Sequence, residues 1–363
     1  MTSFSHQAGL HQAGLYQAAT WFLRSGIQES NGGVGRYYLS DRGANAPVSN
    51  EITGYSVSAL AYLYTLDPHP EYLEALIHGA RYLTNAAWDS ASHTFPFEPG
   101  SPNAYFFDLG IIARGLLAAG RVTGDEKYRA RAREAALSLA FDFLGDGEFH
   151  PVITLPDKQP LQRESKWSRE PGCYQLKAAL VWREIGDEHA TRMFERALAD
   201  ALATHRSFLP GAPDHQAVMD RLHAYCYFLE AILGEGDSPN HHEQVREAVK
   251  WGVAKVASLL REIAPDFERS DVCAQLLRVR LIANHLNILP VDERAAREEA
   301  SRVSAYRAES PDIRLHGGFW FGCKRGKVLP FMNPVSTAFC AQALALWHQH
   351  RTDTWSFELP QLI

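Results

Sequence analysis

The sequence predicts an all-α protein, an (α/α)6 toroid in which six helical hairpins form an inner and an outer ring of helices. Two observations lead to this prediction. Helical segments of two kinds alternate along the chain, one heavily charged and one almost free of charge. The connections alternate as well, being mostly short after the uncharged segments and mostly long after the charged ones. Since no series of alternating strand-like segments interrupts this order, a parallel sheet with crossover helices is not expected.

The charged segments are predicted to be the outer helices. The segment 292–309 carries nine charged residues, and its apolar residues recur at three- and four-residue spacing. Such a helix buries one stripe and leaves the opposite face in water. The predicted outer helices are 11–27, 71–88, 126–144, 188–209, 242–263 and 292–309.

The segments with almost no charge are predicted to be the inner helices. Residues 52–66 and 335–347 contain no charged side chain, and 109–120 contains only Arg114. A helix that is apolar on all sides must be buried on all sides. The inner helices are expected to begin near Glu51, Asp108, Glu170, Asp220, Asp271 and Asn333.

The connections indicate where a functional site would lie. The short turns at 123–126 and 185–188 share the pattern of Gly followed by Asp, which suits the end of one helix and the cap of the next. The long connections at 28–50, 89–103, 145–168 and 310–332 are rich in Gly, Pro and aromatic residues. Long loops are usually functional, and in a closed ring all of these lie at the N-terminal ends of the inner helices.

Composition narrows the function classes. The chain has 363 residues, of which 46% are hydrophobic and 21% charged, and one domain spanning 1–363 is expected. A net charge of −6 without a basic stripe argues against a nucleic-acid partner. No apolar run is long enough to cross a membrane. The five cysteines are widely separated, which suits buried thiols in a reducing, cytoplasmic location.

No cofactor or metal is expected. The sequence lacks a C-x-x-C pair and an H-E-x-x-H motif, and its short glycine runs lack the flanking residues of a phosphate loop. The helix alternation resembles the six-hairpin glycosidase superfamily over nearly the whole chain. The resemblance implies a carbohydrate or another small molecule as substrate. Terpenoid cyclases and prenyltransferases share the toroid, but their DxDD and DDxxD clusters are absent here.

Acidic residues recur at the predicted starts of the inner helices. Acids are common there because they cap free N–H groups and meet the positive end of the helix dipole. Glycoside hydrolysis, however, needs two carboxylates, one as acid and one as base or nucleophile. Glu51 and Asp108 are the first choices, since no other acid lies near them in sequence and burial would raise the pKa of one of them. Glu170 and Asp220 are further catalytic candidates, although each has an adjacent arginine as a possible ion partner.

Aromatic and polar residues of the same regions are candidates for substrate binding. Aromatic rings can stack on the apolar faces of sugars, although they also pack loops onto helix ends. Basic side chains can hold acidic groups of a substrate. The candidates are Arg36, Tyr37, Tyr55, Tyr105, Trp167, Tyr174, Arg221, His223, Trp320, Lys324 and Asn333.

Three functions are compatible with these residues. The preferred one is a glycoside hydrolase that uses a carboxylate pair. The second is a sugar epimerase or a polysaccharide lyase on the same toroid, with His223 and tyrosines as acid and base. The third is a non-catalytic toroid that binds a glycan or a protein.

Overall fold

The computed structural model describes residues 15–145, 147–164 and 166–363. The chain divides into two compact units, which are considered separately. The first, called the Glu51 unit, comprises Gln28–Arg36 and Ala46–His205. The second, called the His223 unit, comprises the described residues of Met1–Ile27 together with Tyr37–Asn45 and Arg206–Ile363.

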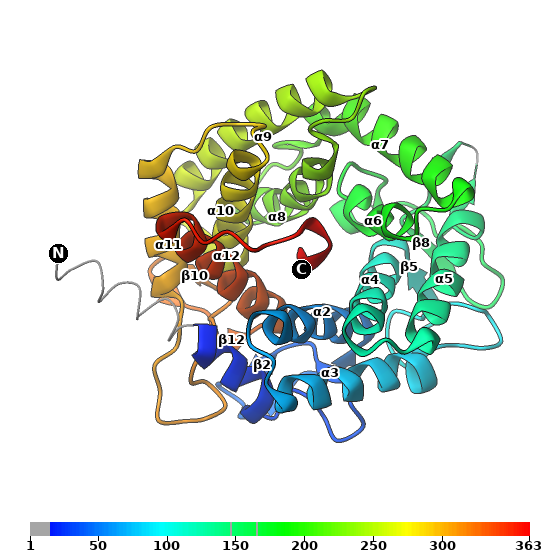
Figure 1. Cartoon of the computed structure of the whole chain (residues 1–363), viewed down its shortest axis with the longest axis horizontal. Helices are drawn as coiled ribbons and strands as arrows, with labels where there is room; N and C mark the ends of the chain where they lie inside the picture. Colours follow the sequence, from blue (N-terminus) through cyan, green and yellow to red (C-terminus); the bar gives the residue numbers. More distant parts are fainter. Residues whose placement is uncertain (1–14, 146, 165) are drawn as a thin grey trace. The chain divides into compact units, whose positions relative to one another are not determined.

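Three buried helices organise the Glu51 unit. α2 (Asn50–Leu66) packs against α4 (Phe106–Thr123), which packs against α6 (Gln175–Ile185). α3 (Pro70–Tyr82) lies against α2 and continues as the π-helical η1 (Leu83–Ala87), and α5 (Glu126–Phe141) lies against α4 (Figure 1). α7 (Glu188–Phe208) follows α6, and the boundary between the units falls near its end.

Glycines allow the buried helices of this unit to approach closely. A Cβ atom on Gly115 would lie 2.5 Å from the carbonyl oxygen of Gly54, so α2 and α4 meet backbone to backbone. A Cβ atom on Gly110 would lie 2.5 Å from the Cβ of Ala178, which brings α4 equally close to α6. Because this close packing leaves no room for a side chain, glycine occurs inside these helices despite its cost to helix stability.

The His223 unit repeats the arrangement. α8 (His215–Ile232), α10 (Ser270–His285) and α12 (Pro334–Thr352) pack in this order, with α9 (His242–Ile263) against α8 and α11 (Glu293–Ala305) against α10 and α12 (Figure 1). Residues 15–24 are also helical. They are part of the predicted helix 11–27, of which residues 25–27 are not helical and residues 11–14 lie outside the described residues. The short 3-10 helices are η2 (Trp167–Arg169), η3 (Leu233–Glu235) and η4 (Leu359–Gln361).

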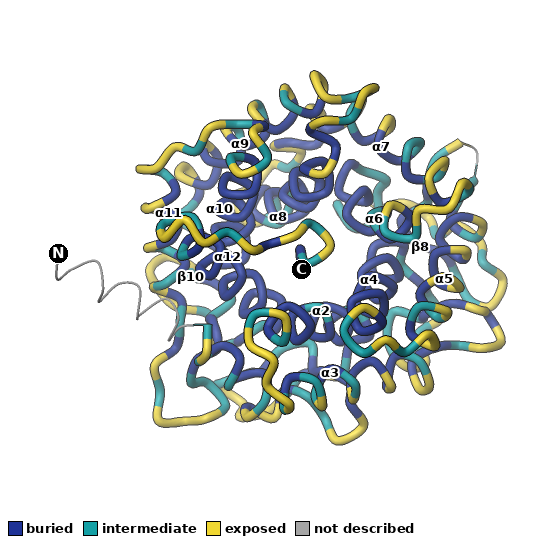
Figure 2. The backbone as a smooth tube through the Cα atoms, viewed as in Figure 1, coloured by how far each residue is buried: buried dark blue, intermediate teal, exposed yellow. Residues whose placement is uncertain are grey.

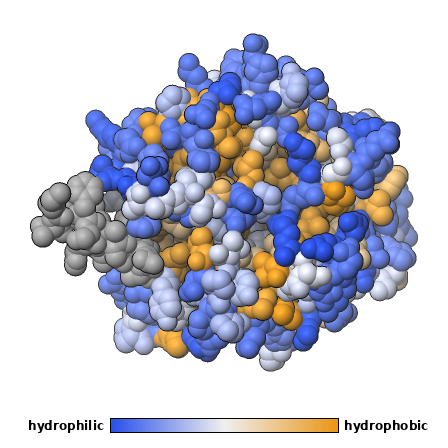
Figure 3. Space-filling view, in the orientation of Figure 1, coloured by the Kyte–Doolittle hydropathy of each residue, from blue (hydrophilic) through white to orange (hydrophobic). Residues whose placement is uncertain are grey.

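Burial separates the two kinds of helix as the charge pattern predicts. α2, α4, α10 and α12 are buried over most of their length, whereas α5, α9 and α11 alternate between buried and exposed residues (Figure 2). Hydrophilic side chains dominate the face drawn in Figure 3. All five cysteines are free, and all but Cys323 are buried. Within the described part of the chain, no helix combines the length and apolar character needed to span a membrane.

Short antiparallel strands form within the long loops and hold them together. In the Glu51 unit β1 (Val34–Gly35) pairs with β4 (Val48–Ser49), β5 (Asn103–Tyr105) with β8 (Val152–Thr154), and β6 (Leu144–Gly145) with β7 (Glu148–Phe149). In the His223 unit β10 (Gly322–Lys324) lies between β9 (Phe267–Arg269) and β11 (Lys327–Val328). There β2 (Tyr38–Leu39) also lies between β12 (Phe331–Met332) and β3 (Ala44–Asn45). These strands were not predicted, because two- and three-residue pairings leave no periodic signal in the sequence.

Two of the predicted starts of buried helices are wrong. Glu170 has an extended backbone (φ −118°, ψ 140°) and α6 begins only at Gln175. The residue before a proline is driven out of the helical region, and Pro171 follows Glu170. α8 begins at His215, with the Asp214 side chain accepting a hydrogen bond from the N–H of Ala217, so Asp220 lies inside the helix.

Candidate active site

A small sheet places Arg36 near the start of α2. The β1–β4 pairing places the segment 34–36 alongside 47–49, and the N–H of Arg36 donates to the carbonyl of Pro47 (3.0 Å). The N–H of Val34 donates to the Thr53 hydroxyl in the first turns of α2 (2.9 Å). Arg36 is therefore held near the end of α2 that carries Glu51.

Asn50 attaches a second loop to the same helix start. This side chain is fully buried; its Nδ2 donates to the carbonyl of Pro96 (2.8 Å), and its Oδ1 accepts from the Tyr82 hydroxyl (3.0 Å). The N–H of Phe97 donates to the carbonyl of Asn103 (2.8 Å), which closes the loop 97–103 just before α4. The loop between η1 and β5 thus connects the first turns of α2 and α4.

Glu51 and Asp108 occupy those first turns, and the charge of one carboxyl acts on the pKa of the other. Burial raises the pKa of Glu51 to about 7, against the opposing charge of Arg36. Burial raises the pKa of Asp108 well above its usual range, the Glu51 carboxylate raises it further, and Arg36 opposes the rise. The Oδ2 atom of Asp108 is buried and has no hydrogen-bond partner among the described residues.

These shifts indicate that the pair holds one proton near neutral pH. Two neighbouring carboxyls push their pKa values apart, because the first to ionise opposes the second. Glu51 ionises first, since Arg36 favours its charged form and the resulting carboxylate raises the pKa of Asp108, which keeps the proton. One neutral and one ionised carboxyl is the arrangement that general acid catalysis with a charged partner needs.

Aromatic rings and arginines form a continuous platform beside the pair. The Arg36 guanidinium lies 4.8 Å from the centre of the Phe97 ring, and the Phe97 and Tyr105 ring centres are 4.9 Å apart. The Arg169 guanidinium lies 5.4 Å from the Tyr105 ring centre. Arg36 also pairs with Glu98 (2.9 Å). We call Arg36, Phe97, Tyr105 and Arg169 the aromatic platform.

The other predicted residues of the Glu51 unit surround these elements. The Trp167 ring packs edge-on against Tyr174, with 5.1 Å between ring centres. The Tyr174 hydroxyl donates to the backbone carbonyl of Glu170 (3.1 Å). Tyr55 is buried within α2. The structure therefore places Trp167, Glu170 and Tyr174 together, with Glu170 outside the helix and before the start of α6.

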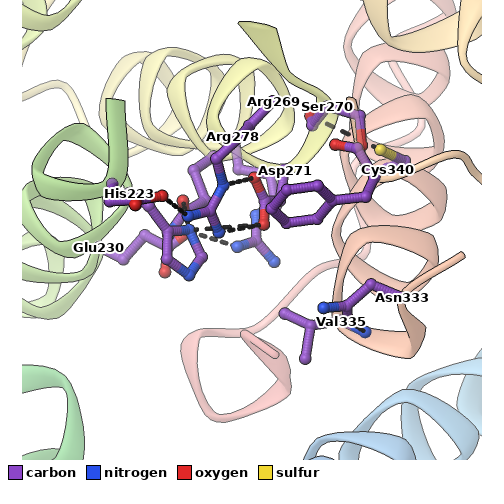
Figure 4. Close-up of polar contacts among 12 residues, drawn as sticks. His223, Glu230, Arg269, Ser270, Asp271, Arg278, Asn333, Val335 and Cys340 are labelled. Atoms are coloured by element: carbon purple, nitrogen blue, oxygen red, sulfur yellow. Dashed lines mark hydrogen bonds and ion pairs between the residues drawn. The ribbon is translucent and has the colours of Figure 1, made fainter. Parts of the chain in front are cut away.

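A second polar cluster lies in the His223 unit (Figure 4). The Nδ1 atom of His223 lies 2.8 Å from Gln275 Oε1 and 3.7 Å from Asp271 Oδ2. Burial and the charge of Arg269 lower the pKa of His223 to about 4, although Asp271 opposes the fall. His223 is therefore a buried, neutral imidazole at physiological pH.

Arg269 holds the acids of this cluster. Its guanidinium donates twice to Asp271 (3.0 and 2.7 Å) and once to Asp220 (2.7 Å). Burial alone would raise the pKa of Asp271, but Arg269 and His223 keep it below its usual value. Asp220 is thus an ion-pair partner, as its alternative interpretation allowed, although the partner is Arg269 and not the adjacent arginine.

The remaining predicted residues of the His223 unit make local contacts. Arg221 donates from Nε to the carbonyl of Phe208 (2.9 Å). Lys324 donates to Gln216 (2.8 Å). The other three pack or cap: the Tyr37 ring lies 5.3 Å from that of Phe331, the carbonyl of Trp320 accepts from the Ser270 hydroxyl (2.7 Å), and the Asn333 side chain accepts from the N–H of Val335 (2.7 Å) at the start of α12.

Sequence reasoning missed Phe97 and Glu98, and it did not include Arg169, Arg269 or Gln275 among the site residues. Phe97 lies in the run Pro96-Phe97-Glu98, inside a connection already marked as functional, so its position was a usable signal. Arg269 and Gln275 join the site through contacts with residues about fifty positions away, which no local pattern reveals. Within the described residues, no group of three or more His, Cys, Asp or Glu side chains is arranged to hold a metal ion.

Comparison with known proteins finds solved structures with a similar fold. No protein-family model and no curated protein sequence matches the chain. The structure is similar to cellobiose 2-epimerase from Spirochaeta thermophila (TM-score 0.72, 15% identity, covering 97% of this chain and 98% of that one). It is also similar to a sugar epimerase from a ruminal bacterium (TM-score 0.70, 12% identity, 93% and 98% covered) and to an unsaturated glucuronyl hydrolase specific for heparin (TM-score 0.65, 11% identity, 95% and 99% covered).

These similarities confirm the predicted fold class. The chain has the (α/α)6 toroid fold. At such identities the likeness carries the fold alone, since one fold hosts many chemistries. The function must therefore be argued from the residues of the site.

Proposed function

We propose that this chain is a carbohydrate-active enzyme, and specifically a glycoside hydrolase in which Asp108 donates a proton and Glu51 is its ionised partner. The observation that supports this most directly is the placement of Glu51 and Asp108 in the first turns of α2 and α4, two helices that pack against each other, with the pKa of both carboxyls raised by burial. The sugar-processing activities named for proteins of the same fold are consistent with it.

The proposed reaction uses the two carboxyls in different protonation states. Asp108 gives its proton to the glycosidic oxygen as the bond to the anomeric carbon breaks, so the leaving sugar departs as an alcohol. Glu51 either removes a proton from the water that attacks the anomeric carbon or attacks that carbon itself. The positive charge of Arg36 favours the ionised form of Glu51 that both routes require.

The aromatic platform supplies a surface for the sugar. The Phe97 and Tyr105 ring centres are 4.9 Å apart, and Tyr105 directly precedes α4, which carries Asp108 in its first turn. Aromatic rings contact the apolar faces of sugar rings, and Phe and Tyr bury large areas when they do so. A sugar bound on this platform would have its glycosidic oxygen near the carboxyl pair.

A substrate screen followed by two substitutions tests the proposal. A panel of oligosaccharides is assayed for release of reducing ends, and the active substrate is then tested with Glu51→Gln and Asp108→Asn. Both changes keep the shape of the side chain, and loss of an acid–base group should lower turnover by about 10²–10⁴. Glu74→Gln, at an exposed position of α3 in the same unit, is the control. Near wild-type turnover in both site variants would refute the carboxylate assignment.

A sugar epimerase is the second candidate, and the state of His223 favours it. A neutral imidazole whose Nδ1 contacts Gln275 can take a proton at Nε2. Epimerisation would require removal of the proton beside the carbonyl of an open-chain sugar and its return on the other face. Solvent deuterium would then be incorporated at that carbon by the wild type and by Glu51→Gln, but not by His223→Asn. This result would favour an epimerase over the hydrolase. Ultraviolet absorbance from an unsaturated product would indicate a lyase.

A further inference from the structure

The guanidinium of Arg169 has no hydrogen-bond or ion-pair partner among the described residues. Its Nη1 atom is shielded from solvent. A guanidinium carries five N–H donors and is always charged. A buried donor that is left unsatisfied lowers stability by its full desolvation penalty. A group kept in this condition beside a candidate active site suggests that the missing partner is a ligand.

Arg169 is held in place by its surroundings. It ends the short helix η2, where its N–H donates to the carbonyl of Lys166 (2.8 Å), and the chain then turns into Glu170 and Pro171. Its guanidinium rests 5.4 Å from the centre of the Tyr105 ring. A planar cation that is fixed over a ring can present its free edge to a second group.

The neighbouring arginines are occupied, in contrast to Arg169. Arg36 pairs with Glu98 (2.9 Å), and Arg163 pairs with Glu148. The Arg169 guanidinium lies over the ring of Tyr105, and Tyr105 directly precedes α4. Arg169 is therefore at the Tyr105 end of the aromatic platform, next to the start of α4.

We propose that Arg169 binds the carboxylate of a uronic acid residue, so that the substrates of the proposed hydrolase are acidic glycans. This inference rests on the proposed function of the Glu51 and Asp108 pair. The planar fork of a guanidinium matches the two oxygens of a carboxylate. A phosphate, with a charge of about −1.5 to −2, would be repelled more strongly by the ionised Glu51 than a singly charged carboxylate.

Binding of simple glycosides tests the inference without any turnover. Methyl glucuronide, methyl glucoside and methyl glucoside 6-sulfate are titrated into the protein by calorimetry or by ligand-observed NMR. The wild type should bind the glucuronide most tightly. Arg169→Gln should weaken the glucuronide by about 10–100-fold, since a hydrogen bond to a charged group contributes roughly 1.5–3 kcal/mol, and should leave the glucoside unchanged. Arg169→Lys keeps the positive charge but lacks the planar guanidinium. Its affinity for the glucuronide should lie between those of the wild type and Arg169→Gln.

A matched control and a second readout separate the possible results. Arg163→Gln removes a paired arginine from the same connection and should leave all three affinities unchanged. On an active substrate, Arg169→Gln should raise KM for a uronide and spare the neutral analogue. Equal binding of glucuronide and glucoside by the wild type, or tighter binding of the sulfate, would overturn the inference. Loss of turnover in Glu51→Gln with unchanged discrimination in Arg169→Gln would leave the hydrolase standing and remove the uronate assignment.

Discussion

Replacing Glu51 by glutamine should stabilise the folded protein at alkaline pH while it removes activity. Burial raises the pKa of Glu51 to about 7 from the model-compound value of 4.5. Between pH 4.5 and about pH 7, the folded protein therefore keeps a proton on Glu51 that the unfolded chain has already released. Glutamine has the same shape and cannot ionise, so the variant escapes the cost of placing a charge at this position.

The sign and size of the effect follow from proton linkage. A carboxyl whose folded pKa is raised makes its full contribution to stability below about pH 4, and loses it as pH rises through the folded pKa of about 7. Each pKa unit corresponds to about 1.4 kcal/mol, so the interval from 4.5 to about 7 sets an upper limit near 3 kcal/mol. Glu51 keeps some surface open to solvent, which reduces the expected change to about 1–2 kcal/mol.

Thermal unfolding at two pH values measures this prediction. The melting temperature of Glu51→Gln minus that of the wild type should increase by about 1–3 °C between about pH 5 and pH 8.5. An unfolding entropy of about 2.1 cal/mol/K per residue makes 1 kcal/mol equivalent to roughly 1.3 °C in a chain of 363 residues. Glu74→Gln, at an exposed site of α3, should show the same difference at both values. A difference for Glu51→Gln that is constant or decreases with pH would refute the raised pKa and the shared-proton arrangement.

Three stability predictions follow from the buried contacts. Arg278→Met should cost about 3–5 kcal/mol, because it leaves the fully buried Glu230 without its ion-pair partner, and adding Glu230→Gln should recover part of the loss. Gly110→Ala should destabilise the protein by about 1–3 kcal/mol, since its new Cβ would lie 2.5 Å from Ala178. Asn333→Ala should cost about 1 kcal/mol by removing the cap of α12, whereas Asn333→Asp should cost much less. Denaturant unfolding measures all three.

Much of the fold could be predicted because burial on all sides and burial on one side leave different charge patterns. The segment 242–263 coincides with α9, and the segments with almost no charge lie within α2, α4 and α12. The errors at Glu170 and Asp220 share a cause. Both acids follow connections that contain prolines, and an acid alone does not mark the first residue of a helix. Pro171 keeps Glu170 outside α6, and the Asp214 cap sets the start of α8 before Asp220.

The candidate site was only partly predictable. Glu51 and Asp108 could be chosen because they stand at the starts of two uncharged segments, and their pKa shifts support the choice. The state of Arg169 could not, because lacking a partner is a property of three-dimensional packing and not of any residue pattern. His223 was chosen as an isolated histidine, while its contacts with Gln275 and Asp271 depend on the packing of α8 against α10.

Hydrolysis of two glycosides that differ only in their leaving group tests the central claim most directly. A nitrophenolate leaves without protonation, whereas an alkoxide needs the proton of a general acid. For the sugar identified in the screen, Asp108→Asn should therefore lose about 10²–10⁴ in kcat/KM on the alkyl glycoside and far less on the nitrophenyl glycoside, while Glu51→Gln should lose activity on both. Equal losses on both substrates in Asp108→Asn, or wild-type rates in both variants, would contradict the assignment of Asp108 as proton donor and Glu51 as its ionised partner.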